Sequence, residues 1–178
     1  MMDDKIKILL AFVLLALAAS IAVFYFWFNS QINLIPEDPK VYVKNMTAED
    51  KINYLYKERI VKYPVKAGVM PFMLNESLKI GISVDKTQLD FGLVTKGLSV
   101  NKVLDFKNND NLPAKVNVVA YGGVKPLVSA PESSFILKSG DKRSITITMN
   151  ATDVGKYEGE VDIIMRVPTF SPLVYIMK

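Results

Sequence analysis

The feature that most constrains this chain is an uncharged stretch of 21 residues near the N-terminus, from Ile8 to Phe28. At about 1.5 Å per residue, a helix of this length spans about 31 Å, which matches a hydrocarbon core about 30 Å thick. Tyr25 and Trp27 lie near its end, and these residue types are enriched at membrane interfaces. The segment Ala16-Leu17-Ala18 has the shape of a signal-peptidase site, but the apolar stretch continues ten residues beyond it, longer than a cleavable signal requires. We therefore expect residues 1–30 to hold a cytoplasmic tip and an uncleaved transmembrane helix.

The charges on either side of this stretch predict its orientation. Lys5 and Lys7 precede it, whereas Glu37 and Asp38 follow it and residues 29–39 contain no lysine or arginine. Because positive residues favour the cytoplasmic side, we expect the N-terminus in the cytoplasm and the C-terminal part outside. Three N-x-S/T sequons fit that location as candidate glycosylation sites: Asn45, Asn75 and Asn150.

Residues 31–76 are expected to form a stem, because four prolines punctuate them and their pattern differs from that of the segment that follows. Thr47 and Asp50 have the spacing of a helix capping box. Apolar residues then recur at helical spacing on one face: Ile52, Leu55, Tyr56 and Ile60. The sequence thus predicts one short amphipathic helix, and a packed or spacer helix is favoured over a partner-docking one.

From residue 77 onward, apolar residues alternate with polar ones, which is typical of β-strands. The predicted strands are Leu78–Val84, Thr87–Val94, Val100–Asn108, Ala114–Tyr121, Ser134–Lys138, Lys142–Asn150, Tyr157–Arg166 and Leu173–Met177. Short strands separated by turn residues favour an all-β fold for residues 77–178, an immunoglobulin-like antiparallel sandwich of about 7–8 strands. The last strand is expected to complete its own fold, with addition to another domain's edge as the alternative.

The alternation also predicts which side chains face the core. Those expected to point inward are Leu104, Phe106, Val116, Val118, Ile145, Ile147, Met149, Tyr157, Val161, Ile163 and Met165. Those expected to face solvent on the strand 157–166 are Glu158, Glu160 and Asp162. Such a face does not suit general acid–base catalysis, which needs buried carboxylates.

A short motif precedes that strand. Asp153-Val154-Gly155-Lys156-Tyr157 has the D-x-G-x-Y form found before strand F of immunoglobulin-like sandwiches. Asp153, Gly155 and Tyr157 are therefore expected to form a structural tyrosine corner, in which the tyrosine hydroxyl bonds back to the backbone. Gly159 stands where an antibody domain has cysteine, which fits a sandwich without disulfides.

Further positions follow a pattern shared with a known group of domains. They are Leu89-Asp90-Phe91-Gly92-Leu93-Val94, Gly97, Val103-Leu104-Asp105-Phe106-Lys107-Asn108, Pro113-Ala114-Lys115-Val116, Phe135, Ser139-Gly140, Ile145-Thr146-Ile147 and Gly155-Lys156-Tyr157-Glu158-Gly159. This pattern resembles the ASH/MSP-type immunoglobulin-like domains. The resemblance implies a binding or scaffolding sandwich without catalytic residues of its own.

The composition narrows the chemistry further. Cysteine and histidine are absent, which excludes thiolate nucleophiles, disulfides, histidine bases and zinc sites built on these residues. Ser77 with Lys79 and Ser139 with Lys142 are close in sequence only, so neither pair predicts a catalytic dyad. We therefore expect no enzyme activity and no cofactor.

Two loops carry residue types that are found in ligand sites. Asn108-Asn109-Asp110-Asn111 offers oxygen ligands but lacks the spacing of a calcium loop, so a polar turn and no metal site is expected. Gly122-Gly123 opens no helix and is not a phosphate loop. The 22 Lys and Arg and 18 Asp and Glu are interspersed, so nucleic-acid binding is not predicted.

The anchor, the sandwich and the missing catalytic groups together favour a non-enzymatic binding or scaffolding protein of the cell envelope. The expected partners are the lipid bilayer and either another envelope protein or surface-layer or wall material. The alternatives are an accessory subunit of a membrane machine (secretion, pilus or archaellum-stator-like) and, less favoured, a wall-acting hydrolase. The Lys- and Ile-rich composition without Cys or His indicates a thermophilic or archaeal source.

Overall fold

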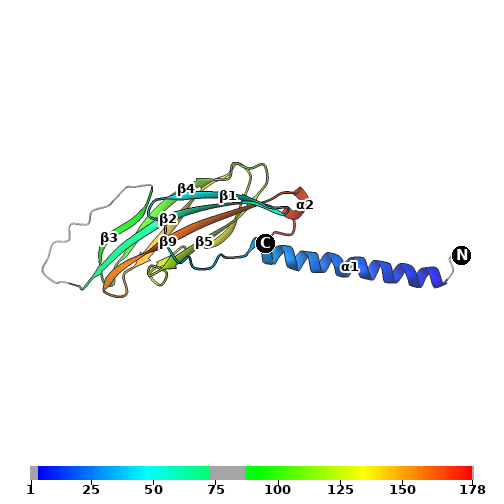
Figure 1. Cartoon of the computed structure of the whole chain (residues 1–178), viewed down its shortest axis with the longest axis horizontal. Coiled ribbons are helices and arrows are strands. Elements are labelled where there is room, and N and C mark those ends of the chain that lie inside the picture. The colour runs from blue at the N-terminus through cyan, green and yellow to red at the C-terminus, as the bar shows by residue number, and fades with distance from the viewer. Residues whose placement is uncertain (1–3, 73–86, 178) are drawn as a thin grey trace.

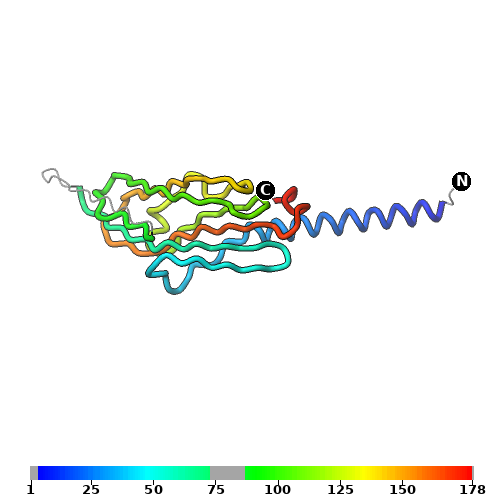
Figure 2. The backbone as a smooth tube through the Cα atoms, turned by 90° about the horizontal axis from the view of Figure 1, so that it is seen from above, coloured from blue at the N-terminus to red at the C-terminus, as the bar shows by residue number. Residues whose placement is uncertain are grey.

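The computed structural model describes residues 4–72 and 87–177. A long helix, α1 (Asp4–Ile32), projects from one end of an elongated β-domain (Figure 1). Seen from above, the helix leaves the domain roughly along its long axis (Figure 2). By length and composition α1 can cross a membrane, and it contains the whole apolar stretch 8–28.

The described strands form two facing sheets. The larger sheet contains β1 (Thr47–Ile52), β2 (Tyr56–Met70), β3 (Leu89–Thr95), β5 (Ala114–Gly122), β7 (Ser134–Leu137) and β9 (Gly155–Pro168). The smaller sheet contains β4 (Ser99–Lys107), β6 (Val128–Ser129) and β8 (Lys142–Asn150). The larger sheet has the order β1-β2-β9-β5-β7, with β3 also on β2, and the smaller has the order β4-β8-β6. All pairs are antiparallel except β2 with β3, which are parallel.

The hydrophobic core lies between the two sheets. Ile145, Ile147 and Met149 of β8 are at most 4 % exposed, which confirms the alternation expected for that strand. Val116 of β5 and Val161 of β9 belong to the same cluster from the opposite sheet. Burying each such side chain stabilises the fold by about 1.5–3 kcal/mol, which allows a domain of this size to fold without disulfides.

Six predicted strands are present, with boundaries that differ by at most two residues. They are β3, β4, β5, β7, β8 and β9. The predicted strand Leu78–Val84 lies outside the described residues. The immunoglobulin-like sandwich expected from the alternation is therefore confirmed.

The helix predicted in the stem is wrong, because residues 47–70 form the hairpin β1–β2 and belong to the larger sheet. Inward-facing side chains alternate along β2: Val61, Tyr63, Val65, Ala67 and Val69. Pairing with β9 from Tyr56 to Val69 outweighs the local helical spacing. Pro64 falls between the part of β2 paired with β1 and the part paired with β3. Neither β1 nor β3 pairs with β2 at Pro64, so the missing amide hydrogen of Pro64 leaves no strand without a donor.

The strand predicted for Leu173–Met177 is also wrong. The chain instead forms a short helix, α2 (Ser171–Val174), followed by a turn. Pro172 occupies the first turn of α2, where its missing amide hydrogen costs nothing. Leu173 and Met177 are buried together, whereas Tyr175, which would share their face in a strand, is 90 % exposed.

Candidate functional site

The segment that joins α1 to β1, residues 33–46, lies along the outer face of the larger sheet, and we call it the tether (Figure 1). The Tyr121 hydroxyl of β5 donates a hydrogen bond of 2.8 Å to the Pro36 carbonyl. The Val43 amide donates one of 2.8 Å to the carboxylate of Glu160 on β9. These two hydrogen bonds attach the tether to the sheet, so it is not a free linker.

The tether also contacts the sheet at Gly122. The amide of Gly122 donates to the carboxylate of Asp38, which also accepts a hydrogen bond from the Tyr42 hydroxyl. A side chain at position 122 would place its Cβ 2.6 Å from the ring of Tyr42, and the backbone φ is +77°. Glycine is therefore required here both for the backbone conformation and for the close approach.

The tether explains why one prediction for β9 is wrong. Glu160 and Asp162, expected on a solvent-exposed face, are only 1 % and 3 % exposed. An alternating pattern shows which side chains share a face but not what covers that face, and here the tether covers it. Each carboxylate has one buried oxygen without a hydrogen-bond partner in the described structure. Glu158, at the end of the same face, is exposed as expected.

Asp162 has the most perturbed carboxyl group of this face. Burial raises its pKa to about 7, and the neighbouring carboxylate of Glu160 acts in the same direction. Lys62, its register partner on β2, opposes the rise, whereas Glu49 on β1 adds to it. Val119 is its partner on β5 and carries no charge. The Asp162 carboxyl therefore holds its proton more tightly in the folded protein than in the unfolded chain.

Arg166 of β9 connects the sheet to the end of α1. Its guanidinium is buried and donates to the carboxylate of Glu58 on β2 at 2.5 Å. It also donates to the carbonyls of Ile32, at 3.0 Å, and Leu34, at 2.5 Å. The Ile32 carbonyl lies in the last turn of α1, where no intrahelical donor remains and the helix dipole is negative, and Leu34 lies two residues beyond the helix. Arg166 thus caps the helix from within the β-domain.

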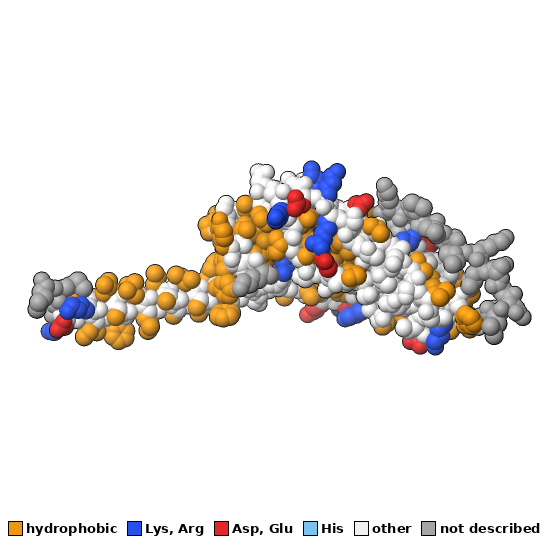
Figure 3. Space-filling view, turned by 180° about the vertical axis from the view of Figure 1, so that it is seen from behind, with side chains coloured by type: hydrophobic (Ala, Val, Ile, Leu, Met, Phe, Trp, Pro, Cys, Tyr) orange, Lys and Arg blue, Asp and Glu red, His pale blue; other side chains and the backbone are white. Residues whose placement is uncertain are grey.

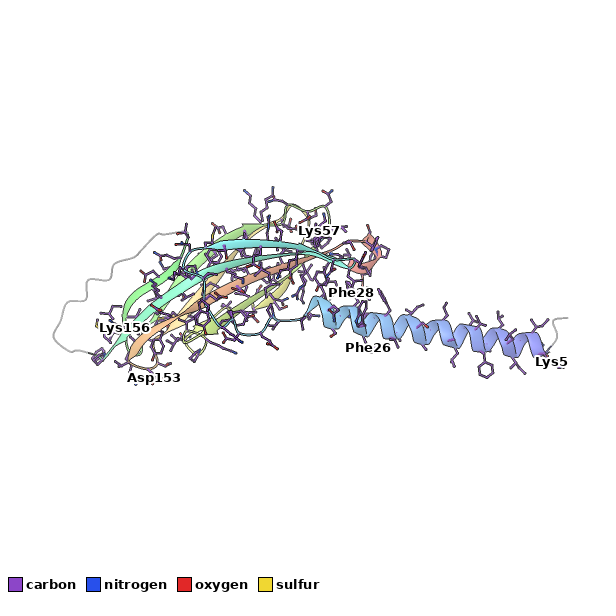
Figure 4. All side chains as sticks on the ribbon, viewed as in Figure 1. Lys5, Phe26, Phe28, Lys57, Asp153 and Lys156 are labelled. Carbon is purple, nitrogen blue, oxygen red and sulfur yellow. The ribbon has the colours of Figure 1, made fainter. Side chains whose placement is uncertain are left out.

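An apolar cluster completes this joint. Phe28 and Ile32 of α1 are fully buried and pack against Leu173 and Met177, with Leu55 of the β1–β2 turn beside them. Figure 4 shows Phe28 where α1 meets the domain. Together with the Arg166 hydrogen bonds, this packing fixes the direction of α1 relative to the sandwich.

A groove runs along the open edge of β5. β7 pairs with β5 as far as Asn117 and the Val118 amide donates to the Ser133 carbonyl, so residues 119–122 have no strand neighbour on that side in the described structure. A cavity of about 330 Å³ follows this edge and reaches between the two sheets. Its lining includes Ile35, Asn117, Val118, Ala120, Val128 and Ser129. We call it the β5 groove.

Asn117 stands out in the wall of the β5 groove. It is 5 % exposed, and its side-chain carbonyl accepts a hydrogen bond from the Ser134 hydroxyl. Its amide nitrogen is buried without an acceptor in the described structure. A buried donor without a partner costs free energy, and a carbonyl bound in the groove would offset that cost.

The Ser/Lys pairs that are close in sequence form no catalytic dyad among the described residues. The Ser139 hydroxyl donates to the Asp110 carbonyl at 2.7 Å and so connects two turns, with no hydrogen bond to Lys142. Ser77 and Lys79 lie outside the described residues. Within residues 4–72 and 87–177, no group of three acidic residues could hold a metal ion.

The Asn108–Asn111 cluster is a structural turn. Asn108 is fully buried, and its amide donates to the carbonyls of Leu112, Leu137 and Lys138. Its side-chain carbonyl accepts the amide of Asp110. The polar groups of Asn108 are therefore used in joining two loops.

The remaining predicted residues lie in distinct places. The Tyr157 hydroxyl donates to the Asp153 carbonyl at 2.8 Å, the bond expected of a tyrosine corner. Tyr25 and Trp27 lie on the last third of α1. Asn45 and Asn150 are exposed, whereas Asn75 lies outside the described residues. The tether contacts were missed because no periodic pattern marks an extended segment that packs through hydrogen bonds.

Comparison with known proteins identifies the domain. A family model described as "HYDIN/CFA65/VesB-like, Ig-like domain" matches residues 81–175, more than half of the chain. The chain belongs to this family. No curated protein and no solved structure gave a match. The match to the HYDIN/CFA65/VesB-like Ig-like domain includes β3 to β9 and leaves α1, the tether, β1 and β2 outside it.

Substitution of Arg166 by Met should destabilise the Ig-like domain by about 3 kcal/mol, because it leaves Glu58 and two carbonyls without their buried partner. Urea unfolding of the full chain in detergent, followed by circular dichroism, measures this. Arg59→Met is the matched control, since Arg59 pairs with Asp50 on an exposed surface and should cost below about 1 kcal/mol. Adding Glu58→Leu to Arg166→Met should restore part of the loss. Equal effects of the two arginine substitutions would contradict the assigned role.

The raised pKa of Asp162 predicts the direction of a pH effect. The folded state retains this proton up to about pH 7, whereas the unfolded chain loses it near the ordinary value of 3.8. The stability contributed by Asp162 is therefore complete below about pH 4 and decreases as the pH rises through about 7. Asp162→Asn should flatten this part of the stability–pH profile, and Asp141→Asn, in an exposed turn, should not. An unchanged profile in Asp162→Asn would disprove the assignment.

Proposed function

We propose that this chain is a membrane-anchored, non-enzymatic binding or scaffolding protein of the cell envelope, with its N-terminus in the cytoplasm and its Ig-like domain outside. The joint between α1 and the sandwich is the observation that carries this proposal. Phe28 and Ile32 are part of the packing of the β-domain, and Arg166 caps the helix. A helix built into the fold in this way supports a permanent anchor over a removable signal sequence.

The β5 groove is the binding surface that we propose. An open strand edge offers backbone amides and carbonyls to an added strand, and pockets on either side take its alternating side chains. The groove has this form, because its lining lies on both faces of β5: Ile35 on the tether side, and Val128 and Ile147 between the sheets. We infer that the ligand is an extended segment of another envelope protein, and that the free amide of Asn117 binds one of its carbonyls.

The type of Ig-like domain, the sequons and the alternative ligands complete the proposal. The ASH/MSP-type resemblance supports a scaffolding role within the Ig-like class. The exposed sequons at Asn45 and Asn150 fit a location outside the cell. Wall or surface-layer material is the alternative ligand, and a subunit role in a membrane machine is the form that a permanent protein partner would take.

Native mass spectrometry of the full chain, extracted in mild detergent from its own membrane, tests this function. We expect a mass above 19.9 kDa, with a second polypeptide in fixed ratio. Ser129→Trp should remove that polypeptide, because the exposed Ser129 lines the β5 groove and a tryptophan there fills it.

The matched control is Val154→Trp, an exposed position in the turn between β8 and β9, which should retain the partner. Both variants should show the thermal unfolding midpoint of the native chain. Loss of the partner in both variants, or in neither, would contradict the proposed groove. A bare monomer from native membranes would contradict a protein partner and favour wall material.

A further inference from the structure

The end of the Ig-like domain that receives α1 carries exposed aromatic residues. Tyr54 in the β1–β2 turn is 93 % exposed, Phe170 before α2 is 61 % exposed, and Tyr175 after α2 is 90 % exposed. In Figure 3 hydrophobic side chains continue from the helix onto the adjoining end of the domain. Large aromatic side chains normally lose most of their exposure on folding, so three exposed ones at a single end need an explanation.

These residues are held together by the fold. The Thr169 amide and hydroxyl donate to the carbonyls of Leu55 and Tyr54, at 2.9 and 2.7 Å, which joins the β1–β2 turn to the start of α2. Leu173 and Met177, on either side of Tyr175, are buried against α1. The exposed aromatic residues therefore have a fixed position relative to the helix.

The position of this end along α1 follows from the same contacts. Phe28 is the last residue of the apolar stretch, whose length of about 31 Å equals the thickness of a bilayer core. Leu173 and Met177 contact Phe28 and Ile32, so α2 lies beside the turns of α1 that leave the bilayer. Trp27, 49 % exposed, lies at the same level of the helix.

We propose that Tyr54, Phe170 and Tyr175 insert into the headgroup region of the membrane that α1 spans. The partner of this surface is the lipid interface itself. Aromatic rings with one polar edge, such as tyrosine, are favoured at that depth. The domain then rests on the membrane at a second place besides the helix, and its long axis is directed away from the bilayer. This inference rests on the anchoring role of α1 proposed above.

Tryptophan quenching by brominated lipids tests the two claims separately, because Trp27 is the single tryptophan of the chain. The full-length protein is reconstituted into vesicles whose phosphatidylcholine carries bromine near the headgroup end of the acyl chains. Native Trp27 reports the anchor. In a Trp27→Phe background, Phe170→Trp and Tyr175→Trp report the aromatic end, and Val154→Trp is the control.

Val154 is exposed, and its neighbour Asp153 lies at the far end of the domain (Figure 4). We expect brominated lipid to reduce the emission of Trp27, Phe170→Trp and Tyr175→Trp, and to leave Val154→Trp unchanged. Quenching of Trp27 with none at positions 170 and 175 would overturn the inference and leave the anchor in place. No quenching at Trp27 would overturn both. The replaced residues are exposed, so the fold should persist, and circular dichroism verifies this.

Discussion

The guanidinium of Arg166 is a buried cation, and a buried cation is stable only where its donors are satisfied and its charge is opposed. In this protein the opposing groups come from two sources: the Glu58 carboxylate of the neighbouring strand, and the carbonyls at the negative end of α1. The helix is therefore part of the electrostatic balance of the sheet. Removing either the helix or the arginine leaves the other with unsatisfied buried groups. The packing of Phe28 and the path of the tether both follow from this arrangement.

The tether extends the contacts between the N-terminal segment and the larger sheet beyond the end of α1. By covering the outer face of β9, it buries Glu160 and Asp162, and it leaves each with one oxygen without a partner. Such groups cost stability and are tolerated because the surrounding contacts outweigh that cost. The result is a domain without disulfides that is stabilised from both sides of one sheet: by the hydrophobic core on one face and by the tether on the other.

Prediction from sequence succeeded where the physical signal was local and periodic. The alternation in β8 identified Ile145, Ile147 and Met149 as core residues, and the apolar stretch 8–28 identified α1. It failed where distant contacts decide the structure. The hairpin β1–β2 owes its form to pairing with β9, and residues 171–177 form a short helix and a turn because α1 offers an apolar surface to pack on. The β5 groove could not be foreseen, because it depends on where β7 stops pairing with β5.

The family match and the proposed function are consistent with a helix that is fixed to the sandwich. The HYDIN/CFA65/VesB-like Ig-like domain provides the sandwich, and the segments outside the match provide the helix, the tether and the hairpin that orient it. In the function that we propose, a rigidly mounted sandwich would present its open β5 edge in a constant direction from the membrane. A fixed arrangement suits a scaffold better than a flexible linker would, because a fixed geometry lowers the entropy lost on binding a partner.

The rigid joint is tested most directly by the distance between two spin labels across it, in the full chain reconstituted in nanodiscs. The chain contains no cysteine, so Ala22→Cys on α1 and Val103→Cys on β4 can be labelled without further changes. Both positions are exposed. A built-in joint predicts one narrow distance distribution, which becomes broad when Arg166→Met is added. A broad distribution in the otherwise native chain would contradict the central claim and show that the helix is only a flexible attachment.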